Sequence, residues 1–414
     1  MSVFAGLLPD TAPLRASRSF RLLWLGQLGS QTGTQLRMVA LPFQVYLLTG
    51  SSLDVGLLGL FQAIPLLLFA LFGGAIADTF DRRRILVITQ SGLLLTSLAL
   101  GLVTHLGLAT LPVLYGLTAV GAAFSAIDQP VRGSLVPTLV ERRDLAAAIT
   151  LNQVLFQTAS IAGPAIGGLA IAALGVESAY WLNAMGFCGS IAAAIAIRVP
   201  QRPPAARFSP LSSVVAGLRY VGASPILLAA MLVDFFAMFL AHPLALFPFY
   251  AQEVFAVGPQ SVGLLYAAPG IGALLAALTA GWIPRLRRHG NALLISIVAW
   301  GFGVAAFGAL SPAAFGFALL LIAFAFAADA ASAILRNTLL QSVVRDEMRG
   351  RLTSIYGLFV TLGPTLGQAR AGAVGALVSP KFSVISGGLA CAAVAALIAL
   401  LVPQLRSYER SDRP

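Results

Sequence analysis

The sequence predicts an all-α integral membrane protein with twelve transmembrane helices in two six-helix halves. Hydrophobic residues make up 58% of the 414 residues and charged residues only 10%, with a mean hydropathy of +0.89. A soluble core could not bury so much apolar surface. Apolar stretches long enough to cross a hydrocarbon layer of roughly 30 Å follow one another along the chain. Basic residues separate these stretches in alternate loops.

The apolar stretches define the predicted spans and their order. They lie at 20–48, 54–77, 84–105, 110–130, 146–173, 178–198, 224–251, 260–284, 291–310, 312–335, 352–378 and 380–403. Runs such as 189–197 and 389–402 lack the alternating polarity of barrel strands, so the spanning elements are expected to be helices.

The loop charges predict the orientation. Nearly all of the 26 lysines and arginines fall at the amino end, at the carboxyl end or in every second loop. Lys381 lies in an opposite-side loop, whereas Arg37 and Arg370 lie inside predicted spans. We therefore expect a multi-pass protein with both termini cytoplasmic, which requires an even number of spans. This one-sided distribution accounts for the net charge of +11 without a nucleic-acid partner.

No motif for metal, nucleotide or covalent chemistry is found in the sequence. Cys188 and Cys391 lack metal-like spacing, and Lys381 is not part of a phosphate-binding loop. We therefore expect no cofactor, no metal and no enzymatic activity.

The chain repeats itself after about half its length. Matching segments are Leu41-Pro42-Phe43 and Phe247-Pro248-Phe249, Arg132-Gly-Ser-Leu and Arg336-Asn-Thr-Leu, and Gly163-Pro164-x-x-Gly167-Gly168 and Gly363-Pro364-x-x-Gly367-Gln368. The repeat predicts halves at 1–198 and 221–414, joined by a cytoplasmic linker at 199–220 that contains a possible interfacial helix. Parallel halves of this kind place a substrate site at their interface and alternate its access.

Two motifs resemble those of a known superfamily. Gly73-Gly74-x-Ile76-x-Asp78-x-x-x-Arg82-Arg83-Arg84 resembles the signature loop of the major facilitator superfamily, which implies that fold and a cytoplasmic charge latch. The second half keeps a weaker copy, with Arg285 at the acidic position. Gly163-Pro164-Ala-Ile-Gly167-Gly168 is similar to the antiporter motif of proton-coupled exporters, although Ala159 replaces its first glycine.

Further stretches resemble the bacterial enterobactin exporter family and its macrolide-efflux relatives. They are 49–57, 210–220, 263–268, 339–341 and 348–351. The resemblance implies a monomeric, proton-driven exporter of a small molecule in the bacterial cytoplasmic membrane. It leaves the substrate open between siderophores and hydrophobic antibiotics.

Ionisable residues inside the predicted spans are the candidates for proton coupling. Asp234 is the leading candidate, followed by Asp329 and His242. An acid that meets an arginine in only one conformation can take up and release a proton during the cycle. Alternatively, these acids pair with Arg37 and Arg370 only to hold the bundle together. Asp128 and Arg132, one helical turn apart, predict a separate ion pair.

The resemblance implies that spans one, four, seven and ten line the substrate cavity. The candidate cavity residues are Gln31, Gln35, Arg37, Arg370, Phe235 and Phe239. Aromatic faces suit flat rings such as catechols. The alternative is that several of the phenylalanines face lipid or mark the outer interface. The sequence thus favours a proton-coupled antiporter of a catecholate siderophore. The alternatives are a multidrug or macrolide efflux pump and, less favoured, a nutrient symporter.

Overall fold

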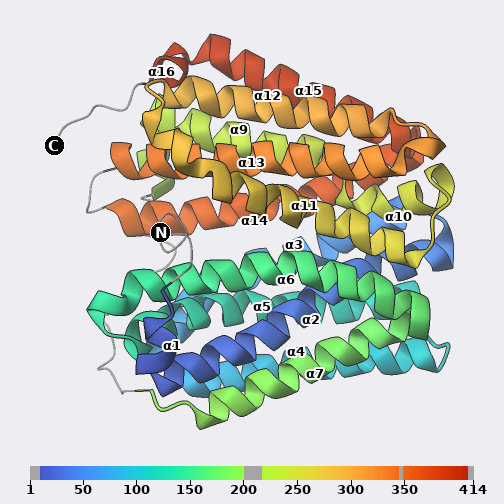
Figure 1. The fold of residues 1–414 in the computed structure, drawn as a ribbon, viewed down its shortest axis with the longest axis vertical. Helices are drawn as coiled ribbons and strands as arrows, with labels where there is room; N and C mark the ends of the chain where they lie inside the picture. Colours follow the sequence, from blue (N-terminus) through green and yellow to red (C-terminus); the bar gives the residue numbers. More distant parts are fainter. Residues whose placement is uncertain (1–9, 200–216, 345–347, 409–414) are drawn as a thin grey trace, which may run out of the picture. The chain divides into compact units, whose positions relative to one another are not determined.

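The computed structural model describes residues 10–199, 217–344 and 348–408, with some side chains excepted, among them those of 70–79. This described part is helical and contains no strand. The long helices are α2 (Arg18–Thr49), α3 (Ser52–Thr79), α4 (Arg82–His105), α5 (Leu111–Leu139), α6 (Leu145–Leu174), α7 (Val176–Ala196), α9 (Pro225–Ala241), α11 (Pro259–Thr279), α12 (His289–Gly308), α13 (Phe315–Val343), α14 (Arg349–Leu377) and α15 (Pro380–Leu401) (Figure 1). Short helices are α1 (Ala12–Ala16), α10 (Phe247–Phe249) and α16 (Pro403–Arg406). Each predicted span overlaps one of these long helices.

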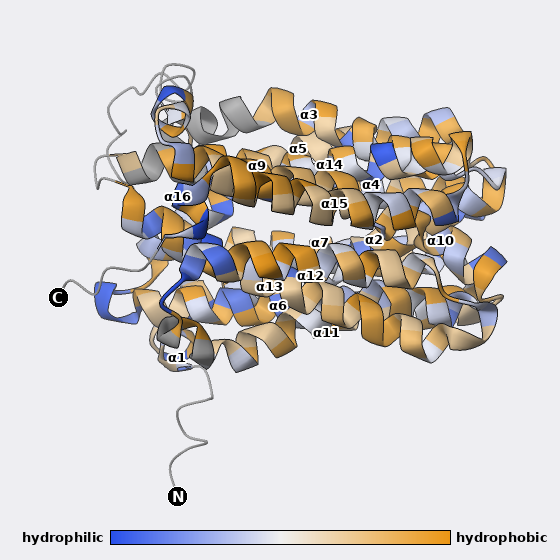
Figure 2. Ribbon diagram, turned by 90° about the horizontal axis from the view of Figure 1, so that it is seen from above, coloured by the Kyte–Doolittle hydropathy of each residue, from blue (hydrophilic) through white to orange (hydrophobic). Residues whose placement is uncertain are grey.

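Most of these helices have the composition of membrane spans. Ten helices in the described residues are long and apolar enough to cross a membrane. Helices α2 and α14 are 32 and 29 residues long but carry three arginines each, which lowers their mean hydropathy. Figure 2 shows hydrophobic residues along the helices and hydrophilic ones mainly near helix ends and loops.

The seventh predicted span is broken, where the sequence predicted one continuous stretch over 224–251. Helix α9 ends at Ala241, and a 3-10 turn at Leu244–Leu246 follows His242 and Pro243. The short helix α10 then leads into a π-helical turn at Tyr250–Val254. Proline lacks the N–H that would continue the α9 hydrogen-bond ladder, which explains the break.

The chain divides into two compact units. The first unit comprises Met1–Leu41 and Ile64–Pro210, and the second comprises Pro42–Ala63 and Leu211–Pro414. The segment 42–63, which precedes the linker in sequence, thus packs within the second unit. There the Ser52 hydroxyl donates to the carbonyl of Gly372, at 3.3 Å. The Tyr46 hydroxyl lies 3.4 Å from the Glu253 carboxylate.

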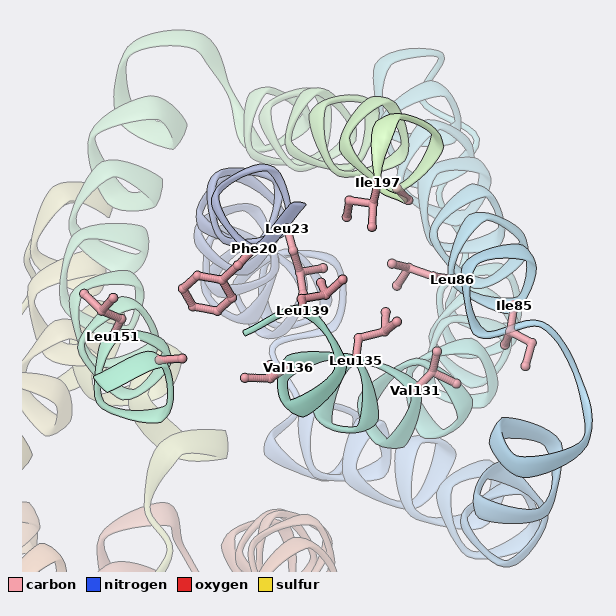
Figure 3. Packing of buried hydrophobic residues seen from close by; sticks show 12 residues of the cluster. Phe20, Leu23, Ile85, Leu86, Val131, Leu135, Val136, Leu139, Leu151 and Ile197 are labelled. Carbon is pink, nitrogen blue, oxygen red and sulfur yellow. The ribbon is translucent and has the colours of Figure 1, made fainter. Parts of the chain in front are cut away.

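The core of the first unit lies where α2, α4, α5, α6 and α7 converge. Figure 3 shows Phe20 and Leu23 of α2 beside Leu135 and Leu139 of α5, with Leu86 of α4 completing the cluster. All of these side chains are buried. Lipid gives little drive for two apolar helices to associate, so close packing of this kind must hold the bundle together.

Candidate transport site

A buried ion pair joins two helices of the second unit. Nη1 of Arg336 on α13 lies 2.8 Å from Oδ1 of Asp234 on α9, and both side chains are only 3% exposed. An ionised side chain is costly at membrane depth unless it is paired. Asp234 and Arg336 therefore offset each other's charge in this conformation, although Nη1 of Arg336 has no hydrogen-bond partner among the described residues.

Two further polar residues surround this pair. Nε of Arg336 donates to the hydroxyl of Tyr356 on α14, at 3.1 Å, and the guanidinium lies over the tyrosine ring. Asp329, two helical turns before Arg336 on α13, interacts electrostatically with both Asp234 and Arg336. Arg336 thus pairs with Asp234 and also attracts Asp329, so a proton that binds to either acid changes the charge that the other acid experiences. We name Asp234, Asp329, Arg336 and Tyr356 the acidic cluster.

The first unit has a related arrangement around Arg132 of α5. Arg132 forms the predicted ion pair with Asp128, one turn earlier on the same helix, which is thereby confirmed. Asp128 also accepts hydrogen bonds from Thr89 and Gln90 of α4, both at 2.7 Å. The guanidinium of Arg132 reaches the hydroxyl of Ser30 on α2, at 3.3 Å.

The two arginines occupy matching positions of the sequence repeat, but their acids do not. Arg132 takes its acid from its own helix and meets only a serine on α2, the first long helix of its half. Arg336 takes its acid, Asp234, from α9, the first long helix of its half. The N-terminal pair can therefore stay closed when helices move, whereas the C-terminal pair separates if α9 and α13 part.

Arg336 directly follows the predicted span 312–335, so the sequence placed it among the basic residues of a cytoplasmic loop; that assignment is wrong. The side chain is 2% exposed and lies within α13. The repeat of Arg132-Gly-Ser-Leu as Arg336-Asn-Thr-Leu was the available signal, because Arg132 is predicted to pair within its helix.

Arg370 does not form the ion pair with Asp234; Arg336 does. Nη1 of Arg370 donates to the carbonyls of Leu240, at 2.7 Å, and of Ser383, at 3.3 Å. Leu240 lies at the end of α9, where the break at Pro243 leaves carbonyls without a helical donor. Arg370 therefore caps the broken helix, where a positive charge also complements the helix dipole.

His242 forms part of the same break. Its side chain is buried, and Nδ1 has no hydrogen-bond partner among the described residues. The imidazole packs edge-on against Phe326 of α13, with ring centroids 6.3 Å apart. This setting is compatible with either a proton group or a neutral residue at the kink.

Aromatic rings gather on α9 beside the acidic cluster. Phe235 stacks on Phe239, with centroids 6.0 Å apart, and packs edge-on against Phe359 of α14, at 5.8 Å. Phe235 and Phe239 are partly exposed, whereas Phe236 is exposed. The phenylalanines nearest Asp234 thus leave some aromatic surface accessible.

The three polar cavity candidates on α2 have different surroundings. Gln35 lies at the contact with α6, because a Cβ atom added at Gly163 would come within 2.5 Å of the Gln35 Cβ. Gln31 is partly exposed. Arg37 lies against α5, since a Cβ added at Gly121 would be 3.0 Å from its Nη1.

Comparisons with known proteins identify the family. The model of the transmembrane secretion effector family matches residues 9–413. The chain belongs to this family of major facilitator transporters. The described residues contain no group of three or more potential metal ligands. The family and the fold are those of membrane transporters.

Curated relatives and solved structures of other proteins are similar to this chain. The chain is 26% identical over 398 residues to the enterobactin exporter EntS of Shigella boydii and to that of Escherichia coli O81, covering 96% of this chain and 95% of each relative. A bacterial homologue of the lysosomal transporter Spinster has a TM-score of 0.75 at 17% identity, covering 96% of this chain and 98% of that one. A bacterial homologue of ferroportin has a TM-score of 0.71 at 17% identity, covering 94% and 99%.

The antiporter-like motif of this transporter packs helices closely. Gly163 and Gly167 of α6 face α2, where an added Cβ at Gly167 would lie 3.2 Å from Leu36. Gly363 and Gly367 of α14 face α9 in the same way. Pro164 lies inside α6 and Gly168 is buried in it. In each half, the repeated glycines thus allow one helix to approach the first long helix of that half closely.

The signature loop of this transporter ties helix ends together. Arg82 donates to the carbonyl of Ser134 on α5, at 3.1 Å, and Arg83 donates to the carbonyls of Ala194, at 3.2 Å, and Ile195 at the end of α7. Gly73, Gly74 and Asp78 lie within α3, but their side-chain surroundings are outside the described residues. The predicted charge latch therefore stays a prediction.

Proposed function

We propose that the protein is a proton-coupled antiporter that exports a siderophore, such as a catecholate, across the bacterial cytoplasmic membrane. The observation that carries the export assignment is the similarity to enterobactin exporters along almost the whole chain. In this proposal the protein acts as a monomer, with both termini in the cytoplasm, and alternates access between the two sides of the membrane.

The acidic cluster supports proton coupling. In the conformation described above, Asp234 is paired with Arg336, which favours its ionised form. A motion that separates α9 from α13 leaves an unpaired carboxylate inside the membrane, and protonation relieves that cost. Asp234 is the proposed proton carrier, and Asp329 supplies a second acid on the same arginine.

The aromatic rings of α9 support a flat, aromatic substrate. Phe235 and Phe239 offer partly exposed ring faces close to Asp234 along the helix. A catechol ring can stack on such a face, and ring stacking contributes about 0.5–1.5 kcal/mol beyond burial. The same rings suit an apolar antibiotic, so a macrolide or multidrug efflux pump is the second candidate.

Uptake into inside-out vesicles tests this function. Vesicles that contain the native chain are given a proton gradient with the acidic side inside. Uptake of enterobactin is then compared with uptake of erythromycin. We expect gradient-dependent uptake of enterobactin that an uncoupler abolishes. Uptake of erythromycin without uptake of enterobactin would reject the siderophore and favour the drug pump.

A further inference from the structure

Arg37 lies in the middle of α2 with its guanidinium against neighbouring helices of the first unit. The group rests on the bare backbone of α5 at Gly121, where an added Cβ would lie 3.0 Å from Nη1. Tyr180 of α7, which is fully buried, interacts with it electrostatically. Arg37 as a whole residue is of intermediate exposure.

The described carboxylates of the first unit are engaged elsewhere. Asp10 and Asp81 accept hydrogen bonds from backbone N–H groups near helix starts, and Asp128 is held by Arg132. Glu141 and Asp144 form ion pairs with Arg143, and Glu177 lies beside His105. Asp78 lies outside the described side chains. No described carboxylate of this unit forms an ion pair with Arg37.

Three other arginines inside long helices contrast with Arg37. Arg132 and Arg336 each hold a carboxylate, and Arg370 holds two carbonyls. An arginine keeps its charge at any physiological pH, and a charge at membrane depth is stabilised by an opposite charge. Arg37 thus presents a charged, planar donor with which no described carboxylate of this unit forms an ion pair.

We propose that Arg37 binds a negatively charged group of the transported molecule, so that the substrate is an organic anion, such as a carboxylate or an ionised phenol. The planar guanidinium matches a carboxylate with two parallel hydrogen bonds, which gives both strength and orientation. Gly121 leaves the space that the guanidinium occupies. This inference rests on the proposed function in assuming that a small molecule enters the bundle beside α2.

Binding of matched acids and amides to the purified full chain tests the inference without a proton gradient. The probes are 2,3-dihydroxybenzoate against 2,3-dihydroxybenzamide and naphthalene-2-carboxylate against naphthalene-2-carboxamide, measured by calorimetry. Within each pair only the charge differs substantially. We expect the native chain to prefer the acid by about tenfold or more. Arg37→Gln should reduce that ratio to about one, and Arg37→Lys should keep part of it.

Arg18→Gln is the matched control, because Arg18 is an exposed arginine on the same helix. It should leave the acid preference unchanged. A preference that survives in Arg37→Gln, or no binding of either acid to the native chain, would overturn the inference. Size-exclusion profiles of the variants confirm that they are folded.

The two probe pairs separate this inference from the siderophore assignment. If only the naphthalene pair binds with an Arg37-dependent preference, the anion site stands and the catecholate assignment fails. If the catechol pair binds without any charge preference, the catecholate assignment stands and the anion site fails.

Discussion

Removing the partner of Asp234 should destabilise the protein more than removing both members of the pair. Asp234 and Arg336 are 3% exposed and lie 2.8 Å apart. Breaking a buried pair by removing one member costs about 3–5 kcal/mol, because the other charge stays buried and unpaired. We expect losses of this size in the free energy of unfolding for Arg336→Gln and for Asp234→Asn. The double variant should lose less than either single variant, and therefore clearly less than their sum.

Denaturant titration of the purified chain, followed by tryptophan fluorescence, measures these free energies. The native chain, both single variants and the double variant form a double-mutant cycle. The exposed pair of Glu141 and Arg143 is the matched control, with a distance of 3.0 Å and side chains 70% and 75% exposed. Its coupling energy should stay within about 1 kcal/mol. A coupling energy for Asp234 and Arg336 no larger than that of the control would refute the reasoning.

Three further predictions concern the free energy of unfolding and are tested by the same titration. Gly163→Val should lower the free energy of unfolding by about 1–3 kcal/mol, because the added side chain overpacks the contact of α6 with α2. Gly189→Val is the control, because a Cβ at Gly189 meets open space, and it should cause no such loss. Equal losses in the two variants would contradict this reasoning. Arg370→Gln should cost about 1–3 kcal/mol by leaving two carbonyls unpaired, and no loss would show that another donor caps them. Asp128→Ala should cost about 3–5 kcal/mol, because Arg132 loses its carboxylate, and a neutral result would contradict the ion pair.

The fold was predictable because the membrane restricts what the chain can form. Long apolar stretches must be helices when every backbone group needs an internal partner, so the spans follow from hydropathy. The break after α9 was less predictable. A proline inside a span often leaves the helix continuous, as Pro164 does in α6. At Pro243 the chain does bend, and Arg370 supplies a donor to the carbonyl of Leu240 beside the break.

The candidate site was predicted in part. Asp234 and Asp329 were singled out because buried acids are rare in lipid, and the structure brings them to one arginine. That arginine, Arg336, was missed because charged residues near a span end usually belong to a loop. Hydropathy reports the average environment of a window and cannot distinguish a loop arginine from one that is buried in the last turns of a long helix.

Counterflow measured beside gradient-driven uptake tests the proton-coupling claim most directly. Proteoliposomes with the native chain or Asp234→Asn are assayed with enterobactin in both modes. Coupling through Asp234 predicts that the variant loses uptake driven by the proton gradient but keeps exchange of substrate for substrate, which moves no net proton. Gradient-driven uptake that persists in Asp234→Asn at the native rate would contradict the account.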